Sequence, residues 1–173
     1  METTRNELTP YSKHFFNNLG NYLDTKIYFF GSIQRRDYFP RSSDIDVDIF
    51  TDNESSTIMK IQNLLSIDRR DVHKFIYMLP NCNRLVRGTK IQHVDKENNF
   101  STEILVFNDI YKDDVTREHN SKIILPFHIS WLLVLLKYVF YDLELISKKM
   151  YASLKRRLLN GSNSNTEFIV VSS

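Results

Sequence analysis

A glycine-serine pair and an alternating acidic segment are the parts of this chain whose residue types could do chemistry. Gly31 and Ser32 follow an aromatic run directly, and Asp44 and Asp46 open the acidic segment further along. Glycine has no Cβ and serine adds a hydroxyl donor, so backbone amides can approach a phosphate closely at such a turn. Two aspartates two positions apart on a strand share one face, with Cα atoms about 6.6 to 7 Å apart. This spacing suits shared metal ions.

Crowded carboxylates need a cation to coexist in a cleft. At an effective dielectric of about 20, each pair costs on the order of a few kcal/mol when no cation intervenes. Mg²⁺ prefers oxygen ligands, keeps some waters and completes its octahedron with substrate phosphates. Two such ions about 3.5 to 4 Å apart can hold the attacking and the leaving oxygen of a phosphoryl displacement. The pattern therefore predicts two Mg²⁺ ions, a nucleoside triphosphate as substrate, and nucleotidyl transfer.

Gly31-Ser32, followed by the Ser-Asp-Ile-Asp-Val sequence of residues 43–47, resembles the signature of the DNA polymerase β-like nucleotidyltransferase superfamily. The closest pattern is that of its minimal nucleotidyltransferases, in which an arginine commonly follows the Gly-Ser pair. The resemblance implies that Gly31 and Ser32 cradle the β- and γ-phosphates and that Arg35 pairs with the triphosphate, with Arg36 and Arg41 near enough to replace it. The family often has glycine where this chain has Arg36.

The resemblance also implies a fold and a third acidic residue. The fold is an α/β (α+β) domain with a mixed β-sheet flanked by helices, and a carboxylate on a later strand completes the metal site. Glu103 is the candidate, although the family more often has Asp there, and Asp95 and Asp109 are the alternatives. In this assignment Asp44 and Asp46 would bridge the metals and the α-phosphate. Glu103 would hold the metal that lowers the pKa of the acceptor hydroxyl.

A plain structural interpretation of the acidic segment is also open. Strict alternation is common in half-exposed strands, whose acidic face is simply hydrated. The preceding Gly-Ser pair favours the metal site over this alternative. Asp48 lies on the same face, but the family pattern does not need it, so we expect a solvated or arginine-paired carboxylate there.

The hydrophobic periodicity predicts the elements that must position these residues. Thr9 and Pro10 open an amphipathic helix that ends near residues 20–24, and Ser55 or Ser56 is the expected cap of a second helix. Residues 34–43 and 108–122 are polar connections. A long or kinked helix pair is expected over residues 127–159. The remaining elements are a helix over 54–67 and strands over 26–30, 44–50, 72–79, 85–94 and 100–107, the last two joined by a hairpin loop.

These elements divide the chain into three parts. Residues 1–125 form the nucleotidyltransferase α/β core. Residues 126–160 form a C-terminal helical extension that packs on the core or on a partner. Residues 161–173 are expected to be a flexible tail, within which 168–171 could add a strand but are expected to fray.

Composition narrows the function class. The chain has 173 residues and a formal net charge of +2, which suits one domain and excludes a polyelectrolyte clamp on nucleic acid or a large polymerase. One cysteine and no signal-peptide pattern point to a cytoplasmic protein. Charged residues within 127–146 argue against a membrane span. The five histidines show no zinc spacing, and there is no Walker pattern.

Two function classes remain open. The first is an active enzyme whose hydroxyl acceptor is a protein, an RNA end or a small molecule. The alternative is a catalytically weak or inactive regulatory or antitoxin-like module that docks to a partner through residues 131–141. A homodimer through the C-terminal helix is also possible. Downstream, a basic helix side is expected to be solvated or to bind the acceptor or RNA; it comprises Lys148, Lys149, Lys155 and Arg156.

Overall fold

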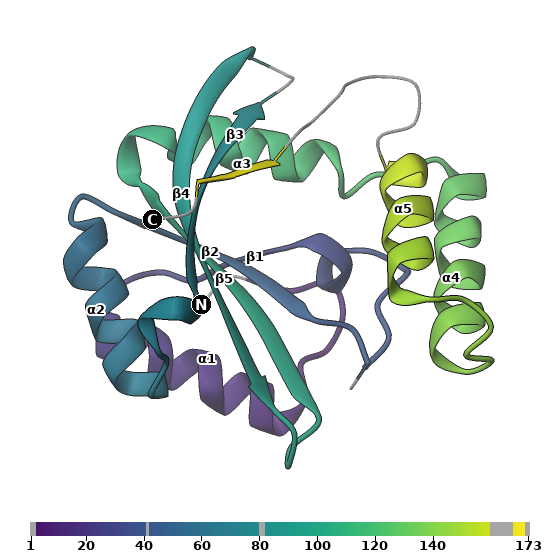
Figure 1. Ribbon diagram of the computed structural model, residues 1–173, viewed down its shortest axis with the longest axis horizontal. Helices are drawn as coiled ribbons and strands as arrows, with labels where there is room; N and C mark the ends of the chain where they lie inside the picture. Colours follow the sequence, from purple (N-terminus) through teal and green to yellow (C-terminus); the bar gives the residue numbers. More distant parts are fainter. Residues whose placement is uncertain (1–2, 41, 80–81, 160–167, 172–173) are drawn as a thin grey trace.

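The protein is built on one mixed, six-stranded β-sheet with helices on both faces (Figure 1). The computed structural model describes residues 3–40, 42–79, 82–159 and 168–171. The strands are β1 (Tyr28–Phe30), β2 (Ile45–Thr51), β3 (Val72–Leu79), β4 (Arg84–Asp95), β5 (Phe100–Asn108) and β6 (Phe168–Val171). The α-helices are α1 (Pro10–Leu23), α2 (Glu54–Leu65), α3 (Lys112–Ser121), α4 (Phe127–Tyr141) and α5 (Lys148–Leu159). Three short 3₁₀ helices are η1 (Gly31–Gln34), η2 (Arg69–Asp71) and η3 (Asp109–Tyr111).

The strand order places the two central strands that matter for the site side by side. The order is β1-β2-β5-β4-β3-β6, and β2 and β5 form the parallel pair while the other neighbours run antiparallel. The long β4–β5 hairpin follows from its short polar loop. A crossover through α2, β3 and β4 lies between β2 and β5. The sequence prediction of a mixed sheet flanked by helices is therefore confirmed.

Local sequence signals explain where the first helices begin. The Thr9 side chain accepts a hydrogen bond from the backbone N–H of Ser12, and Pro10 occupies the first helical position of α1, as predicted. The cap of α2 differs from the expected serines. Asn53 provides it, accepting from the N–H of Ser56, so the cap lies two to three residues before the expected serines, and α2 begins at Glu54 as predicted.

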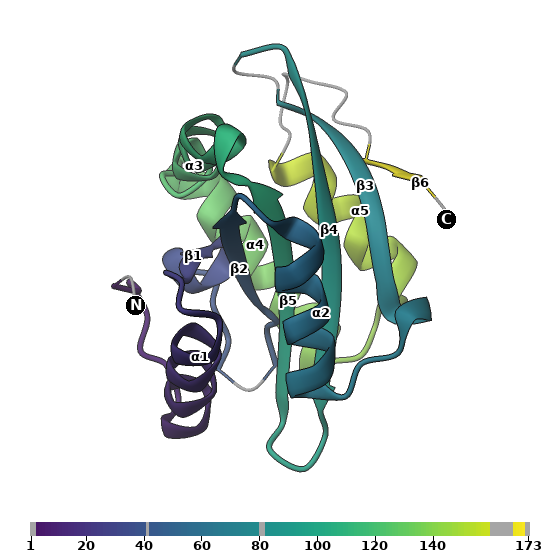
Figure 2. The same ribbon diagram turned by 90° about the vertical axis from the view of Figure 1, so that its left-hand side faces the viewer.

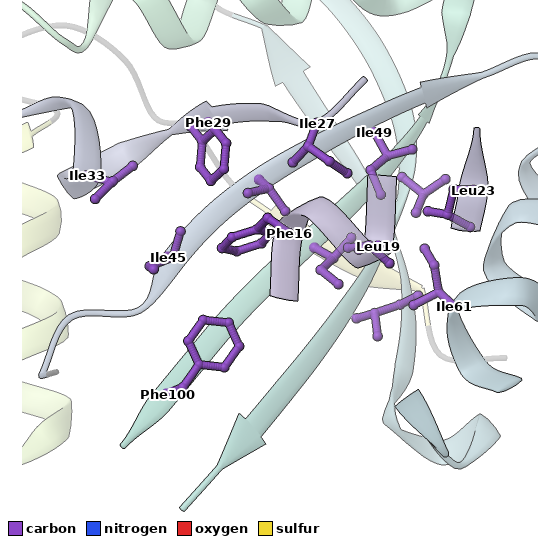
Figure 3. Packing of buried hydrophobic residues seen from close by; sticks show 14 of the residues in the cluster. Phe16, Leu19, Leu23, Ile27, Phe29, Ile33, Ile45, Ile49, Ile61 and Phe100 are labelled. Carbon is purple, nitrogen blue, oxygen red and sulfur yellow. The ribbon is translucent and has the colours of Figure 1, made fainter. Parts of the chain in front are cut away.

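The main hydrophobic core lies between the sheet and the helix pair α1 and α2 (Figure 2). Figure 3 shows Phe16 and Leu19 of α1 and Ile61 of α2 packed over Ile45 and Ile49 of β2. The odd-numbered positions of β2 thus face this core, which is the pairing of faces that the alternation predicts. A smaller second cluster on the opposite face is formed by residues of β2, β3, β4, β5 and α3.

The chain directly after β5 departs from the prediction. Residues 112–121, expected within a polar connection, form α3, whose single buried apolar residue is Val115. So few apolar residues leave no helical period to detect. The expected C-terminal helix pair is α4 and α5, which pack side by side (Figures 1 and 2).

The C-terminal residues 168–171 were expected to fray, and this expectation is wrong. Residues 168–171 form β6, which pairs antiparallel with β3. Residues 160–167 and 172–173, which complete the predicted flexible tail, lie outside the described residues. Within the described part of the chain, every helix is too short or too polar to cross a membrane.

Candidate active site

The Gly-Ser turn lies directly against the second aspartate of the acidic segment. β1 ends at Phe30, which pairs with Asp46 of β2, and η1 begins at Gly31. Gly31 has a positive φ of 71°, a backbone conformation that favours glycine. A Cβ at this position would overlap a carboxylate oxygen of Asp46 and lie 3.0 Å from its carboxyl carbon. The absence of a side chain at position 31 is therefore what makes room for the Asp46 carboxylate.

Parallel pairing brings a third carboxylate to the same row of the sheet. In the register of β2 with β5, Asp46 is opposite Glu103, and Asp44 immediately precedes β2. The side chain of Thr102 donates a hydrogen bond to the carbonyl of Ile45 at 2.7 Å, which helps to fix this register at the start of both strands. Glu103 is thus the acidic residue of the later strands that lies beside Asp46.

The two alternatives to Glu103 lie elsewhere. Asp95 is in the β4–β5 hairpin, where hydrogen bonds from Tyr11 and Asn98 lower its pKa to about 2. Asp109 is an exposed residue of η3, beyond the opposite end of β5. Neither carboxylate lines the cavity that contains Asp44, Asp46 and Glu103.

This cavity has a volume of about 370 Å³ and lies between the sheet and the helices α3, α4 and α5. One part of its wall is polar and carries the acidic residues and the Gly-Ser turn, and another part is aromatic. The residues of its wall are Phe30, Gly31, Ser32, Arg35, Ser43, Asp44, Asp46, Phe75, Tyr77, Glu103, Leu105, Phe107, His119, Lys122, Lys137, Tyr141, Tyr151, Lys155 and Leu159.

Desolvation and neighbouring acids dominate the electrostatics of Asp46. Burial, followed by the negative charge of Glu103, raises the pKa of Asp46 to about 7, although Lys155 acts in the opposite direction. Glu103 accepts a hydrogen bond from Lys90 of β4. In the described part of the chain, no three acidic, histidine or cysteine side chains converge into a preformed metal site. Asp44, Asp46 and Glu103 therefore share one cavity, with Asp46 and Glu103 opposite each other on neighbouring strands.

Arg35 lines the same cavity but is held by a neighbouring acid. Its Nε and Nη2 atoms donate to the two carboxylate oxygens of Asp37 at 2.8 and 3.2 Å. Burial alone would raise the pKa of Asp37, but the hydrogen bond and charge of Arg35 outweigh it and lower that pKa. Arg36 is exposed, and Arg41 lies outside the described residues.

A buried lysine of α4 contacts the loop between η1 and β2, which contains Arg35 and Asp37. The Lys137 Nζ atom donates to the Ser43 hydroxyl at 2.8 Å and to the carbonyl of Asp37, and lies 3.5 Å from the Asp37 carboxylate. Only 2 % of Lys137 is exposed. Burial lowers its pKa to about 8, against the attraction of Asp37. The position of α4 therefore depends on an ionised group that folding disfavours.

This arrangement predicts an unusual pH dependence of stability. Between about pH 8 and the ordinary lysine value, the unfolded chain binds a proton that the folded chain does not, so folding becomes more favourable as the pH rises. We expect wild type to gain about 1 to 2 kcal/mol relative to Lys137→Met between pH 8 and 9.5. Urea denaturation of both proteins at several pH values measures this difference. Burial raises the pKa of Tyr141 and Tyr151, which keeps these phenols neutral in that range.

Lys149, an exposed residue of α5, provides the matched control. Lys149→Met should show the same pH dependence as wild type. If the stability of Lys137→Met instead runs parallel to that of wild type over the whole range, burial does not disfavour the charge of Lys137.

Sequence reasoning missed several residues of the cavity wall. Lys155 was grouped with the solvated basic side of the last helix, yet it lines the cavity beside the buried Tyr151. Tyr151 and Lys155 are four residues apart, so a one-turn spacing was the signal available. His119 lies in α3 and Lys122 directly follows this helix, which the polar sequence did not indicate.

Asp48 corrects a further expectation. It is not solvated, because only 2 % of it is exposed, and its Oδ2 atom lies 2.7 Å from Nδ1 of His119. The two residues are far apart in the sequence, and nothing in the alternation of β2 could indicate the partner.

Comparisons with known proteins agree with this geometry. A sequence model described as a nucleotidyltransferase domain matches residues 13–125, which is more than half of the chain. The matched segment includes the Gly-Ser turn, the acidic segment and Glu103. Searches of the curated proteins and of the solved structures gave no match.

Proposed function

Because this chain belongs to the nucleotidyltransferase domain family, we propose that it transfers a nucleoside monophosphate from a nucleoside triphosphate to a hydroxyl acceptor and releases pyrophosphate. The observation that supports this most strongly is the row of residues formed by Asp46 and Glu103 across β2 and β5, with Gly31 against the Asp46 carboxylate. The Gly-Ser turn, which we call the phosphate turn because it would bind phosphate, lines one cavity together with the acidic residues.

In this proposal the triphosphate binds at the Gly-Ser turn. Ser32 and the amides around Gly31 hold the β- and γ-phosphates in this proposal. Arg35 contributes positive charge, and its bidentate contact with Asp37 keeps the guanidinium at the cavity wall. Lys155, which lines the same cavity, is a further candidate for a phosphate contact.

The acidic residues fit Mg²⁺ by the chemistry of their donors. Asp44, Asp46 and Glu103 offer the carboxylate oxygens that this ion prefers. The raised pKa of Asp46 supports a cation site because positive charge would relieve a half-buried carboxylate beside another acid. When bound, Mg²⁺ supplies charge neutralisation at the phosphates and lowers the pKa of the acceptor hydroxyl. Two ions remain the expectation from the family pattern.

Label transfer tests the proposal. Wild type is incubated with Mg²⁺ and each of four α-³²P-labelled nucleoside triphosphates, in the presence of total RNA, total protein or a mixture of small hydroxyl compounds. We expect label in one acceptor fraction, and on the order of 10³-fold less of it with Asp44→Asn. The matched control is Asp109→Asn, an exposed acid outside the cavity, which should transfer label as wild type does.

The results distinguish an enzyme from a binding module. Transfer that survives in Asp44→Asn would contradict the assignment of the acidic residues. If wild type transfers no label to any fraction, the proposed activity is wrong.

An exposed apolar surface on α4 supports a second proposal, namely that the protein contacts a partner protein or a second copy of the chain. On α4, Phe127, Trp131 and Leu135 are all more than half exposed and recur four residues apart. Such a surface is typical of helices that pack against another chain. The family match favours the transferase over an inactive docking module, so this contact would accompany the activity and not replace it.

A further inference from the structure

Asp48 and His119 form a buried pair that the proposed function does not use. The Nδ1 atom of His119 lies 2.7 Å from Oδ2 of Asp48, and 14 % of the histidine side chain is exposed. The imidazole stacks on the ring of Phe30 with centroids 4.0 Å apart and planes 14° apart. One ring nitrogen and one ring face are therefore fixed by β2 and β1, the two strands that carry the phosphate turn and the aspartates.

The pair lies next to the acidic row of the sheet. Phe30, on which the imidazole stacks, is the register partner of Asp46, and Asp46 is opposite Glu103. Asp48 follows Asp46 by two positions, about 6.6 to 7 Å along the strand. His119 lines the cavity that these acids line. Among contacts between described residues, the hydrogen bond of His119 uses Nδ1, which leaves Nε2 as the nitrogen for a substrate.

We propose that His119 is a catalytic residue that accepts the proton of the acceptor hydroxyl, and that Asp48 is the positioning residue that fixes its tautomer. This inference rests on the proposed nucleotidyl transfer. The hydroxyl oxygen forms a bond to the α-phosphorus while the bond from that phosphorus to the pyrophosphate oxygen breaks. The hydroxyl proton moves to Nε2, and pyrophosphate carries away the electron pair. An acid that accepts the Nδ1 proton holds the opposite nitrogen ready as a base.

The other basic group in this part of the cavity is less suited to the role. Lys122 donates to the Tyr77 hydroxyl at 3.0 Å and lies 2.9 Å from Glu118. Burial works to lower the pKa of Lys122, but its hydrogen bonds to Tyr77 and Glu118 raise it overall. This amine therefore stays protonated and can donate to a substrate but not take its proton.

A purely structural role, in which the pair only fastens α3 to the sheet, makes a different prediction for chemical rescue. His119→Ala removes the base and leaves space for a five-membered ring. We expect label transfer to fall about 10² to 10⁴-fold, and added imidazole to restore it at least about tenfold. Pyrazole has a similar shape but is a much weaker base, so it should restore little. If both rings restore transfer equally, the pair has a packing role and the proposal is wrong.

A second variant guards against a loss of folding. In His119→Asn the side-chain amide can still donate to Asp48, but it cannot accept a proton as imidazole does. We expect a melting temperature close to that of wild type, Mg²⁺-dependent binding of a fluorescent nucleoside triphosphate within about threefold, and a transfer rate about 10²-fold lower. Full transfer by this variant would overturn the proposal. His128→Ala, at an exposed histidine of α4, is the control and should need no rescue.

These measurements separate failure of this inference from failure of the proposed function. If wild type transfers label, Asp44→Asn does not, and His119→Asn does, the transferase stands and the role of His119 falls. If wild type itself transfers none, both are wrong.

Discussion

Asp46→Asn should abolish nucleotidyl transfer and at the same time stabilise the metal-free protein. The carboxylate of Asp46 has a pKa raised to about 7 in the folded chain, from an ordinary value of 3.8, because it is partly desolvated and lies beside the charge of Glu103. The folded state of wild type thus loses stability as the pH rises from about 4 to about 7, where the unfolded chain is already ionised. An amide of the same shape removes this cost. At pH 8 without metal we expect a gain of about 1 to 3 kcal/mol.

Urea denaturation with and without Mg²⁺ measures both effects. Mg²⁺ should raise the stability of wild type but not that of Asp46→Asn, and transfer should fall on the order of 10³-fold in the variant. Asp44→Asn is the informative control, because Asp44 is exposed. It should lose transfer without the gain in stability. A loss of stability in Asp46→Asn would mean that the folded protein satisfies this carboxylate without a cation, and the metal site would have to lie elsewhere.

The sequence predicts the part of the site that local pattern controls. Alternation along residues 44–50 indicates which side chains of β2 face the core, because strand side chains alternate strictly. A special backbone conformation can be expected at Gly31 from the sequence, since few glycines occur in the chain. Glu103 could be proposed only through the family resemblance. Its position opposite Asp46 depends on which strands pair, and strand pairing is a long-range property.

The residues that were missed depend on contacts between distant segments. Asp48 meets His119 only because α3 packs over β1 and β2. Lys137 belongs to an apolar run, and its partners Asp37 and Ser43 come from the loop before β2. When the partners of a lysine in an apolar helix are unknown, the sequence alone predicts that its charge is exposed. Burial and pairing of such groups follow from tertiary packing, which residue periodicity does not specify.

Gly31→Ala should damage the site through backbone strain and a steric clash with Asp46. Because φ at Gly31 is 71°, any L-residue there is strained by about 1 to 2 kcal/mol. The new methyl group would also overlap the Asp46 carboxylate, and relief of that overlap requires the carboxylate to move. We expect a total loss of stability of about 2 to 4 kcal/mol, and transfer at least about 10²-fold below wild type.

A double-mutant cycle separates the clash from the backbone strain. In an Asp46→Ala background the carboxylate is absent and only the Cβ of residue 46 remains, 3.2 Å from the added methyl group. Gly31→Ala should then cost little beyond the backbone part, about 1 to 2 kcal/mol. Gly20→Ala, at a helical glycine whose added Cβ would lie 3.3 Å from the Thr25 carbonyl oxygen, should change stability by less than about 1 kcal/mol and leave transfer intact. Equal costs of Gly31→Ala in both backgrounds would contradict the clash. In that case the glycine would serve the turn alone, and the phosphate turn and the acidic row would not be coupled through contact between Gly31 and Asp46.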